Sequence, residues 1–272
     1  MYKLDEEILR SYFRLEKYQE DRLKLERIWH PEKMNWNTAP PEMCATTHIK
    51  LEELEKIGYG KDLYMEVLAN EKAVRKEIEE LATQHHLWVH TQHISCMGKY
   101  LTGAFIAAGG DITRAPTVSA FWKGMGLDVL PDGQVPRRIR GKKLKRDKDG
   151  NIIKERNIPA LPHVTKLGNQ IREQIMRSGN LTKDIYDEYK AYYAAKYPDR
   201  PNMYNHKGGA RVAQKLLYAV LWEEWRKGYG LAAPWPYAFD ILNHAREHKL
   251  TIYDFYGEKP KRKRNPVEQC DG

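Results

Sequence analysis

The chain has 272 residues, of which 41% are hydrophobic and 11% aromatic, so it can form one large or two small domains and is not wholly disordered. No apolar run approaches the roughly 18 residues of a membrane helix, and the first residues, MYKLDEEILR, do not resemble a secretory signal. Three widely spaced cysteines, Cys44, Cys96 and Cys270, argue against a disulfide scaffold. They favour a reducing, intracellular compartment such as the cytoplasm or nucleoid.

Positive charge is concentrated in two short segments. The 46 Lys and Arg residues exceed the 37 Asp and Glu residues, for a net charge of +9. Residues 137–156 contain ten basic and three acidic side chains, and residues 259–264 contain five basic and no acidic ones, so the rest of the chain carries −3. Such segments predict a polyanionic partner, double-stranded DNA or RNA. The competing interpretation is a solvated loop and a solubilising tail.

In the first half of the chain, apolar spacing predicts amphipathic helices. They are expected over residues 4–29, from about 47 to 58, and over 61–91. Pro31 and the Pro40–Pro41 pair separate the first helix from the second. We take residues 1–90 as a helical N-terminal region.

After residue 91 the predicted helices are shorter. The first of them begins after Gly98. The others are expected within 113–126 and over 164–177, 182–197 with Thr182 as the N-cap, 208–227, and 239–248. Asp149–Gly150, within the polar stretch 131–162, predicts a basic β-hairpin because Asp-Gly accepts the positive φ values of a type I′ turn. The predicted fold is mainly α. Residues 91–257 form a domain with a helix-hairpin-helix element and this β-hairpin, and residues 258–272 form a disordered basic tail.

The segment Ile94–Ala108 resembles a helix-hairpin-helix. Gly98 permits a tight turn, and the free N–H groups at the start of the next helix can bind a DNA phosphate. We therefore expect Gly98, Lys99, Tyr100 and Thr102 to contact DNA. Such hairpins usually carry Gly at both ends of the turn, but here the first position is Cys96. An ordinary corner between two helices is the alternative.

Histidines cluster between residues 85 and 93, and a helix would place His86, His90 and His93 on one face. The pairs Cys44/His48 and His244/His248 are further candidate metal ligands. None of these groups has the spacing of a known four-ligand site, so we expect structural or solvated histidines and neither metal nor cofactor. The chain also lacks the Gly-rich phosphate loop and the Gly-x-Ser-x-Gly elbow. Lys207–Gly209 could receive a phosphate at a helix start or be a plain helix start.

Several segments together resemble the C-terminal domain of the "IS one-ten" insertion-sequence transposases, the DEDD, bridge-RNA-guided recombinases. The matching blocks, in the family's order, are Ile94–Ile112, Arg114–Leu127, Val164–Ile175 and Arg211–Tyr229. The resemblance covers about residues 85–230. It implies a second DNA-contact surface at Lys166, Gly168, Asn169 and Arg172, in the "Thr-Lys-x-Gly-Asn, then Arg" block.

Two features of that family are missing. Its N-terminal RuvC-like nuclease half is β-rich and acidic at its metal site, whereas residues 1–90 here are predicted to be helical. Its nucleophilic serine should fall between the second and third blocks, but no serine occurs between Ser119 and Ser178. A serine recombinase needs an activated hydroxyl to form its covalent DNA intermediate.

The sequence therefore predicts a helical DNA-binding protein related to these transposases, without strand-cutting activity and with no assigned catalytic residue. Its basic segments add expected phosphate contacts. Those contacts are Arg137, Arg138, Arg140, Lys142, Lys143, Lys145, Arg146, Lys261, Arg262, Lys263 and Arg264. A homo-oligomer is compatible with the long helices, and a membrane partner is not expected.

Three alternatives remain open. One is an active or partner-dependent recombinase, whose nucleophile would be Ser95, Ser119, Ser178 or a tyrosine. Another is a helix-hairpin-helix base-excision glycosylase, although Ser119 stands where such enzymes keep an Asp. The third is an RNA-binding or structural protein of a mobile element or virus.

Overall fold

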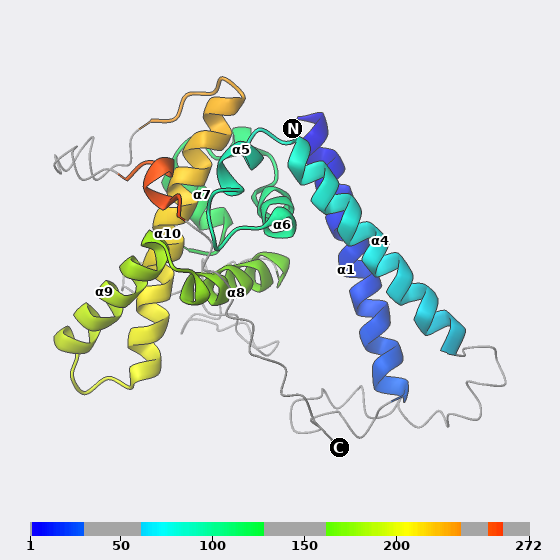
Figure 1. Ribbon diagram of the computed structural model, residues 1–272, viewed down its shortest axis with the longest axis horizontal. Helices are drawn as coiled ribbons and strands as arrows, with labels where there is room; N and C mark the ends of the chain where they lie inside the picture. Colours follow the sequence, from blue (N-terminus) through cyan, green and yellow to red (C-terminus); the bar gives the residue numbers. More distant parts are fainter. Residues whose placement is uncertain (1, 30–60, 128–161, 235–249, 258–272) are drawn as a thin grey trace, which may run out of the picture.

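The computed structural model describes residues 2–29, 61–127, 162–234 and 250–257 (Figure 1). Every regular element within these ranges is helical, which confirms the mainly α class. The elements are α1 (Lys3–Trp29), α4 (Lys61–Gln84), α5 (Trp88–Thr91), α6 (Lys99–Gly109), η2 (Ile112–Arg114), α7 (Val118–Gly124), α8 (Pro162–Arg177), α9 (Leu181–Lys196), α10 (Asn202–Gly228) and η4 (Ile252–Phe255). The expected β-hairpin at Asp149–Gly150, the helices at 47–58 and 239–248, and the basic tail lie outside the described ranges.

Helices α1 and α4 pack side by side as an arm that extends from the rest of the molecule (Figure 1). Polar bonds join the two helices along their length. Arg22 Nε lies 2.7 Å from Glu71 Oε2, and Ser11 Oγ donates to Glu77 Oε1 at 2.8 Å. One end of the arm packs against α6, which joins it to the remaining helices.

The small residues of α6 allow its neighbours to approach closely. A Cβ on Gly103 would stand 2.5 Å from Ile78 Cγ2 of α4, a distance that real side chains do not tolerate. Farther along α6, the Phe105 ring lies 5.1 Å from that of Tyr218 and 5.9 Å from that of Trp225, both on α10. Ile78 and Phe105 belong to one continuous core, so the described core runs across the expected domain boundary at residue 90.

Helices α9 and α10 form the second antiparallel pair (Figure 1). Helix α10 begins at Asn202, six residues before the predicted start, so Gly208 and Gly209 lie inside it. The prediction of a helix start there was therefore wrong, and the phosphate site it implied is not formed. The N-cap of α9 also differs from the prediction. Asn180, not Thr182, caps the helix, and its side chain accepts the Thr182 N–H at 3.2 Å.

The helix predicted over 61–91 is interrupted. Helix α4 ends at Gln84 and α5 begins at Trp88. Between them, the buried His85 ring accepts the Leu87 N–H at Nδ1, at 3.1 Å, and this local bond replaces a helical one. Within the described ranges, no helix combines the length and apolar character needed to cross a bilayer.

Candidate functional site

A cavity of about 1020 Å³ opens where the arm meets the other helices. The first turn of α6 lies at its centre, from Gly98 to Leu101. The arm contributes Gln19 and the pair Arg75 and Glu79. Helix α8 supplies the remaining wall with Gln170, Glu173, Gln174 and Arg177. The hairpin segment and α8, which the sequence singled out separately, therefore meet at one cavity.

The N-terminus of α6 opens into this cavity without a side-chain cap. Gly98 precedes the helix in an extended conformation, with φ −121° and ψ 176°, and offers no side chain to the first turn. The first backbone bond back into this turn runs from Thr102 N–H to Gly98 O at 2.8 Å. The earlier N–H groups of a helix have no partner within it, and the helix dipole makes this end attractive to anions.

Three cationic side chains surround this helix end. Lys99 and Arg177 are exposed, and neither has an acidic partner within the part of the chain that is described. Arg75 lies with its guanidinium 4.5 Å above the Tyr100 ring, and its Nε lies 3.4 Å from Glu79 Oε1. With Glu79 paired to Arg75, the cavity wall keeps two further cations, Lys99 and Arg177, against one further carboxylate, Glu173, and this positive excess favours an anionic ligand.

Of the four expected hairpin contacts, Thr102 does not line the cavity, and Tyr100 lines it but is only half-exposed. The Thr102 side chain is buried, and its hydroxyl donates to Thr91 Oγ1 at 2.9 Å. Tyr100 lies half-buried beneath Arg75, and burial raises the pKa of its hydroxyl. Gly98 and Lys99 are therefore the exposed residues of the expected set.

The expected contact surface on α8 is split between two faces of the helix. Lys166 and Asn169 are exposed, and Lys166 Nζ donates to Gln19 Oε1 at the cavity's edge. Gly168, by contrast, is buried against α10, where a Cβ would stand 3.1 Å from Gln214 Nε2. Arg172 lies beside it and donates to Gly168 O at 3.1 Å, and burial lowers the pKa of its guanidinium. Gly168 and Arg172 thus serve the packing of α8 on α10.

The basic segments cannot be placed relative to this cavity, because they lie outside the described residues. They comprise Arg137, Arg138, Arg140, Lys142, Lys143, Lys145 and Arg146, and the tail residues Lys261, Arg262, Lys263 and Arg264.

Cys96 occupies the position at which the hairpin motif usually has glycine. Its thiol is buried, and Thr182 Oγ1 of α9 donates to its Sγ at 3.8 Å. Burial raises the pKa of Cys96 to about 11, so the thiol is protonated at neutral pH and unreactive. The residue anchors the turn to α9, and the exposed part of the turn begins at Gly98.

The candidate nucleophiles differ in their surroundings. Ser178 is buried, and its hydroxyl donates to Ile175 O at 2.7 Å, so it serves the end of α8. Ser119 is exposed in the first turn of α7. Ser95 lines the cavity, and its Oγ is buried without a hydrogen-bond partner among the described atoms. No described general base is bonded to Ser95, so the geometry that activates a serine nucleophile is not present there.

The histidine cluster is divided among separate structural contacts. His85 is buried against Asp5, His86 Nε2 bonds to Trp225 O at 3.0 Å, and His90 Nδ1 bonds to Tyr256 Oη at 2.7 Å. Because the helix breaks at residues 85–87, these rings do not share one helix face. Within the described ranges, no three His, Cys, Asp or Glu side chains are grouped to hold a metal ion.

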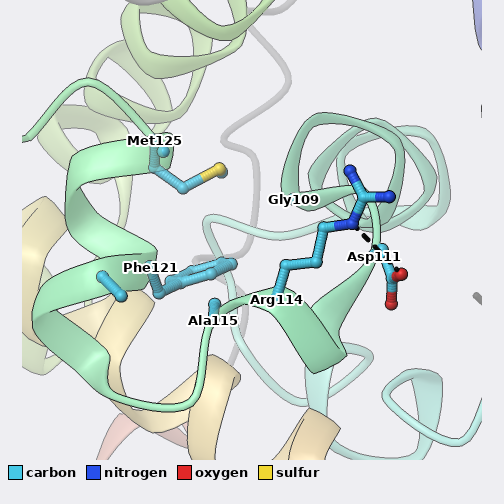
Figure 2. Close-up of a pocket in the computed structure, with 8 residues that line it drawn as sticks. Gly109, Asp111, Arg114, Ala115, Phe121 and Met125 are labelled. Carbon is cyan, nitrogen blue, oxygen red and sulfur yellow. Dashed lines mark ion pairs between the residues drawn. The ribbon is translucent and has the colours of Figure 1, made fainter.

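A smaller pocket of about 280 Å³ lies between the end of α6 and α7 (Figure 2). Figure 2 shows the ion pair at its rim, where Arg114 Nε lies 3.6 Å from Asp111 Oδ2. Asp111 also accepts the side-chain hydroxyl and the N–H of Thr113, bonds that lower its carboxyl pKa. The inner wall is formed by the buried Phe121 and Met125. Asp111, Thr113 and Arg114 thus bond to one another across the rim, an arrangement typical of a structural turn.

Comparison with known proteins identifies no relative. No protein-family model matches the chain, and no significant match was found to a curated protein or a solved structure.

Proposed function

We propose that the chain binds double-stranded DNA through its phosphate backbone, as a relative of the C-terminal domain of the "IS one-ten" transposases without strand-cutting activity. The observation that carries the proposal is the uncapped α6 N-terminus, which opens between Lys99 and Arg177 in one cavity. A helix N-terminus with adjacent cations is a common phosphate site. In the helix-hairpin-helix interpretation, α5 and α6 are the two helices and Gly98 the turn.

The basic segments outside the described residues would extend the same electrostatic contact. Binding by phosphate contacts depends on counterion release, so it weakens steeply with salt. With about six phosphate contacts, the slope of log K against log salt is about −5. Phosphate contacts carry no base information, so different duplex sequences should bind alike.

The test measures binding of a labelled duplex by fluorescence anisotropy at several salt concentrations. In the double variant Lys99→Ala/Arg177→Ala, affinity falls and the slope flattens by about two, one for each lost contact. The matched control is Arg114→Ala/Lys123→Ala, which removes two exposed cations beside the smaller pocket and leaves the slope unchanged. An unchanged slope in the cavity variant overturns the proposed site.

The basic segment has its own test within the same assay. Changing Arg137, Arg138 and Arg140 together to Ala flattens the slope by about three without lowering the melting temperature. Competition between duplex DNA and duplex RNA separates the DNA-binding proposal from the RNA-binding alternative. Incubation with supercoiled plasmid and Mg²⁺ tests the recombinase alternative, since nicks or covalent adducts would show strand cutting.

A further inference from the structure

A second surface lies at the free end of the α9–α10 pair (Figure 1). We name it the tyrosine surface. It consists of Tyr189, Tyr192, Tyr193 and Tyr197 from α9 and the residue that follows it, and Tyr204 from the start of α10. Tyr192 and Tyr204 are 49% and 55% exposed, although large aromatic side chains are usually well buried. Exposed aromatic groups gathered in one place indicate an interaction site.

The rings hold one another in place. The Tyr192 and Tyr193 centroids lie 5.4 Å apart, and Tyr193 and Tyr197 are stacked with an interplanar angle of 17°. Tyr193 is also pressed against the backbone of α10, since a Cβ on Gly208 would stand 2.8 Å from its ring. The rings of Tyr192, Tyr193 and Tyr197 are therefore held in place before any partner binds, which lowers the entropic cost of association.

Cations are interleaved with these rings. Lys196 Nζ lies 5.4 Å from the Tyr192 centroid and donates to the Tyr192 hydroxyl at 3.1 Å. The Arg200 guanidinium lies 4.0 Å above the Tyr197 ring. Neither cation is paired with a carboxylate in the described structure, and between residues 189 and 207 four Lys or Arg side chains face a single acidic residue, Asp199.

This composition distinguishes between a protein and a nucleic acid partner. Cores of protein interfaces are enriched in tyrosine, methionine and arginine but depleted in lysine, of which residues 189–207 hold three. Residues 189–207 contain no Leu, Ile, Val, Phe or Trp, their exposed aromatic rings are tyrosines, and the one large aliphatic side chain among them is Met203, which is 58% exposed. Surfaces that bind single-stranded nucleic acid combine aromatic rings for base stacking with cations for the backbone.

We propose that the tyrosine surface binds single-stranded nucleic acid, with unpaired bases stacking on Tyr192 and Tyr204 while Lys196 and Arg200 contact the phosphates. This inference does not depend on duplex binding at the α6 cavity. The two proposals concern different helices, different probes and different variants.

The test uses the full chain and a fluorescently labelled 20-residue oligothymidylate, with binding followed by anisotropy. Because stacking on one aromatic ring contributes about 1–3 kcal/mol per base, Tyr192→Ala/Tyr204→Ala weakens binding at least tenfold. The Phe/Phe double variant retains affinity within about threefold, and the Leu/Leu variant, which is apolar but cannot stack, loses it as the Ala variant does. Tyr253→Ala is the matched control, because Tyr253 is 66% exposed and lies outside the surface.

Two further measurements make each result decisive. Tyr192→Ala/Tyr204→Ala is expected to bind duplex DNA within twofold of the wild type. If the wild-type chain binds no duplex, that result counts against the α6 cavity and leaves the tyrosine surface untouched. An oligouridylate probe shows whether the 2′-hydroxyl matters, and equal affinity for both probes is expected from stacking. Unchanged oligonucleotide binding by a folded Ala variant overturns the proposal. If light scattering then shows that the variant has lost self-association, the surface is a protein interface.

Discussion

The backbone nitrogen of Lys190 in α9 lies 2.9 Å from the point where a Cβ on Gly209 of α10 would stand. The carbonyl oxygen of Tyr186 is still closer to that point, at 2.7 Å. Both neighbours are main-chain atoms of a helix, so they cannot move aside as a flexible side chain could. The absence of a side chain at residue 209 is what allows α9 and α10 to pack at this distance.

We expect Gly209→Ala to destabilise the fold, because α9 must shift away from α10. Overpacking of this kind costs about 1–3 kcal/mol. Gly124→Ala is the control, since a Cβ there meets nothing within 4 Å. Urea unfolding followed by circular dichroism measures both variants. Equal midpoints for Gly209→Ala and the wild type would show that the pair relaxes without cost.

Tyr229→Phe tests the buried polar cluster that joins α1, α4 and α10. The Tyr229 hydroxyl donates to Asp5 Oδ1 at 2.6 Å, and His85 Nε2 lies 3.0 Å from the same oxygen. Because Nδ1 of His85 accepts a backbone N–H, the geometry assigns its proton to Nε2, which donates to Asp5. Removing the tyrosine hydroxyl leaves a buried carboxylate with one donor fewer, at a cost of about 1–2 kcal/mol.

The comparison for this variant is Tyr253→Phe, which alters an exposed tyrosine and should leave the free energy of unfolding unchanged. A double-mutant cycle between Tyr229→Phe and Asp5→Asn is expected to be non-additive, since both changes act on one hydrogen bond. Additive losses would indicate that the tyrosine acts through packing alone.

The lowered pKa of His86 predicts that the folded protein loses stability in acid. Burial, with a smaller contribution from His85, lowers the pKa of His86 to about 4. The unfolded chain, with an ordinary pKa near 6.5, therefore binds a proton that the folded chain does not. This contribution to stability is complete above about pH 6.5 and is lost as the pH falls toward 4. Because the ring is partly exposed, we expect a loss of about 1 kcal/mol.

Thermal melting of the wild type and His86→Gln between pH 4 and pH 8 checks this expectation. The glutamine amide can still donate to Trp225 O but does not titrate, so the variant should show a shallower decline below pH 6.5. His93→Gln, at an exposed histidine, serves as the reference and should keep the wild-type slope. Parallel curves for all three proteins would show that His86 does not carry the effect.

Arg226→Lys should destabilise the protein by about 2–3 kcal/mol, because the buried guanidinium and its planar set of N–H donors are lost. The Arg226 side chain donates to Ala232 O at 2.6 Å, to Ile112 O at 3.0 Å and to Ala115 O at 3.2 Å. A single ammonium cannot reach all three carbonyls in the same geometry. Denaturant unfolding of this variant is compared with Arg114→Lys, whose side chain is 86% exposed and should have little effect. A near-neutral Arg226→Lys would mean that water replaces the lost bonds.

Local signals predicted most of the described helices. Apolar periodicity located α1 and α8 to within two residues, and Pro198 marks the end of α9. The start of α10 was missed because glycines usually interrupt helices, whereas here the Gly208–Gly209 pair is stabilised by its contact with α9. At the break, the His85 ring accepts the Leu87 N–H and also bonds to Asp5, 80 residues away, and apolar periodicity reveals neither contact.

The candidate site was less predictable because it depends on which way each helix faces. Gly98 and Lys99 are exposed as expected, since their exposure follows from the turn itself. The inward orientation of Gly168 and Arg172 is set by Gln214 and Tyr218 on α10, and no local pattern contains that information. The tyrosine surface has a signal in the sequence, the repeated Tyr and Lys between residues 189 and 204, but the repeat does not indicate which of these side chains are exposed.

The Asp5 carboxylate has a consequence for the order in which the protein is made. It binds His85 at a separation of 80 residues and Tyr229 at a separation of 224. During synthesis the first bond can form as soon as α4 leaves the ribosome, while the second must wait until α10 has emerged. For that interval, at roughly 5–20 residues per second, the Asp5 carboxylate of the nascent arm has one of its two final donors. The Tyr229 hydroxyl is therefore the last member of the cluster to bind Asp5, and its bond joins α1 to the end of α10.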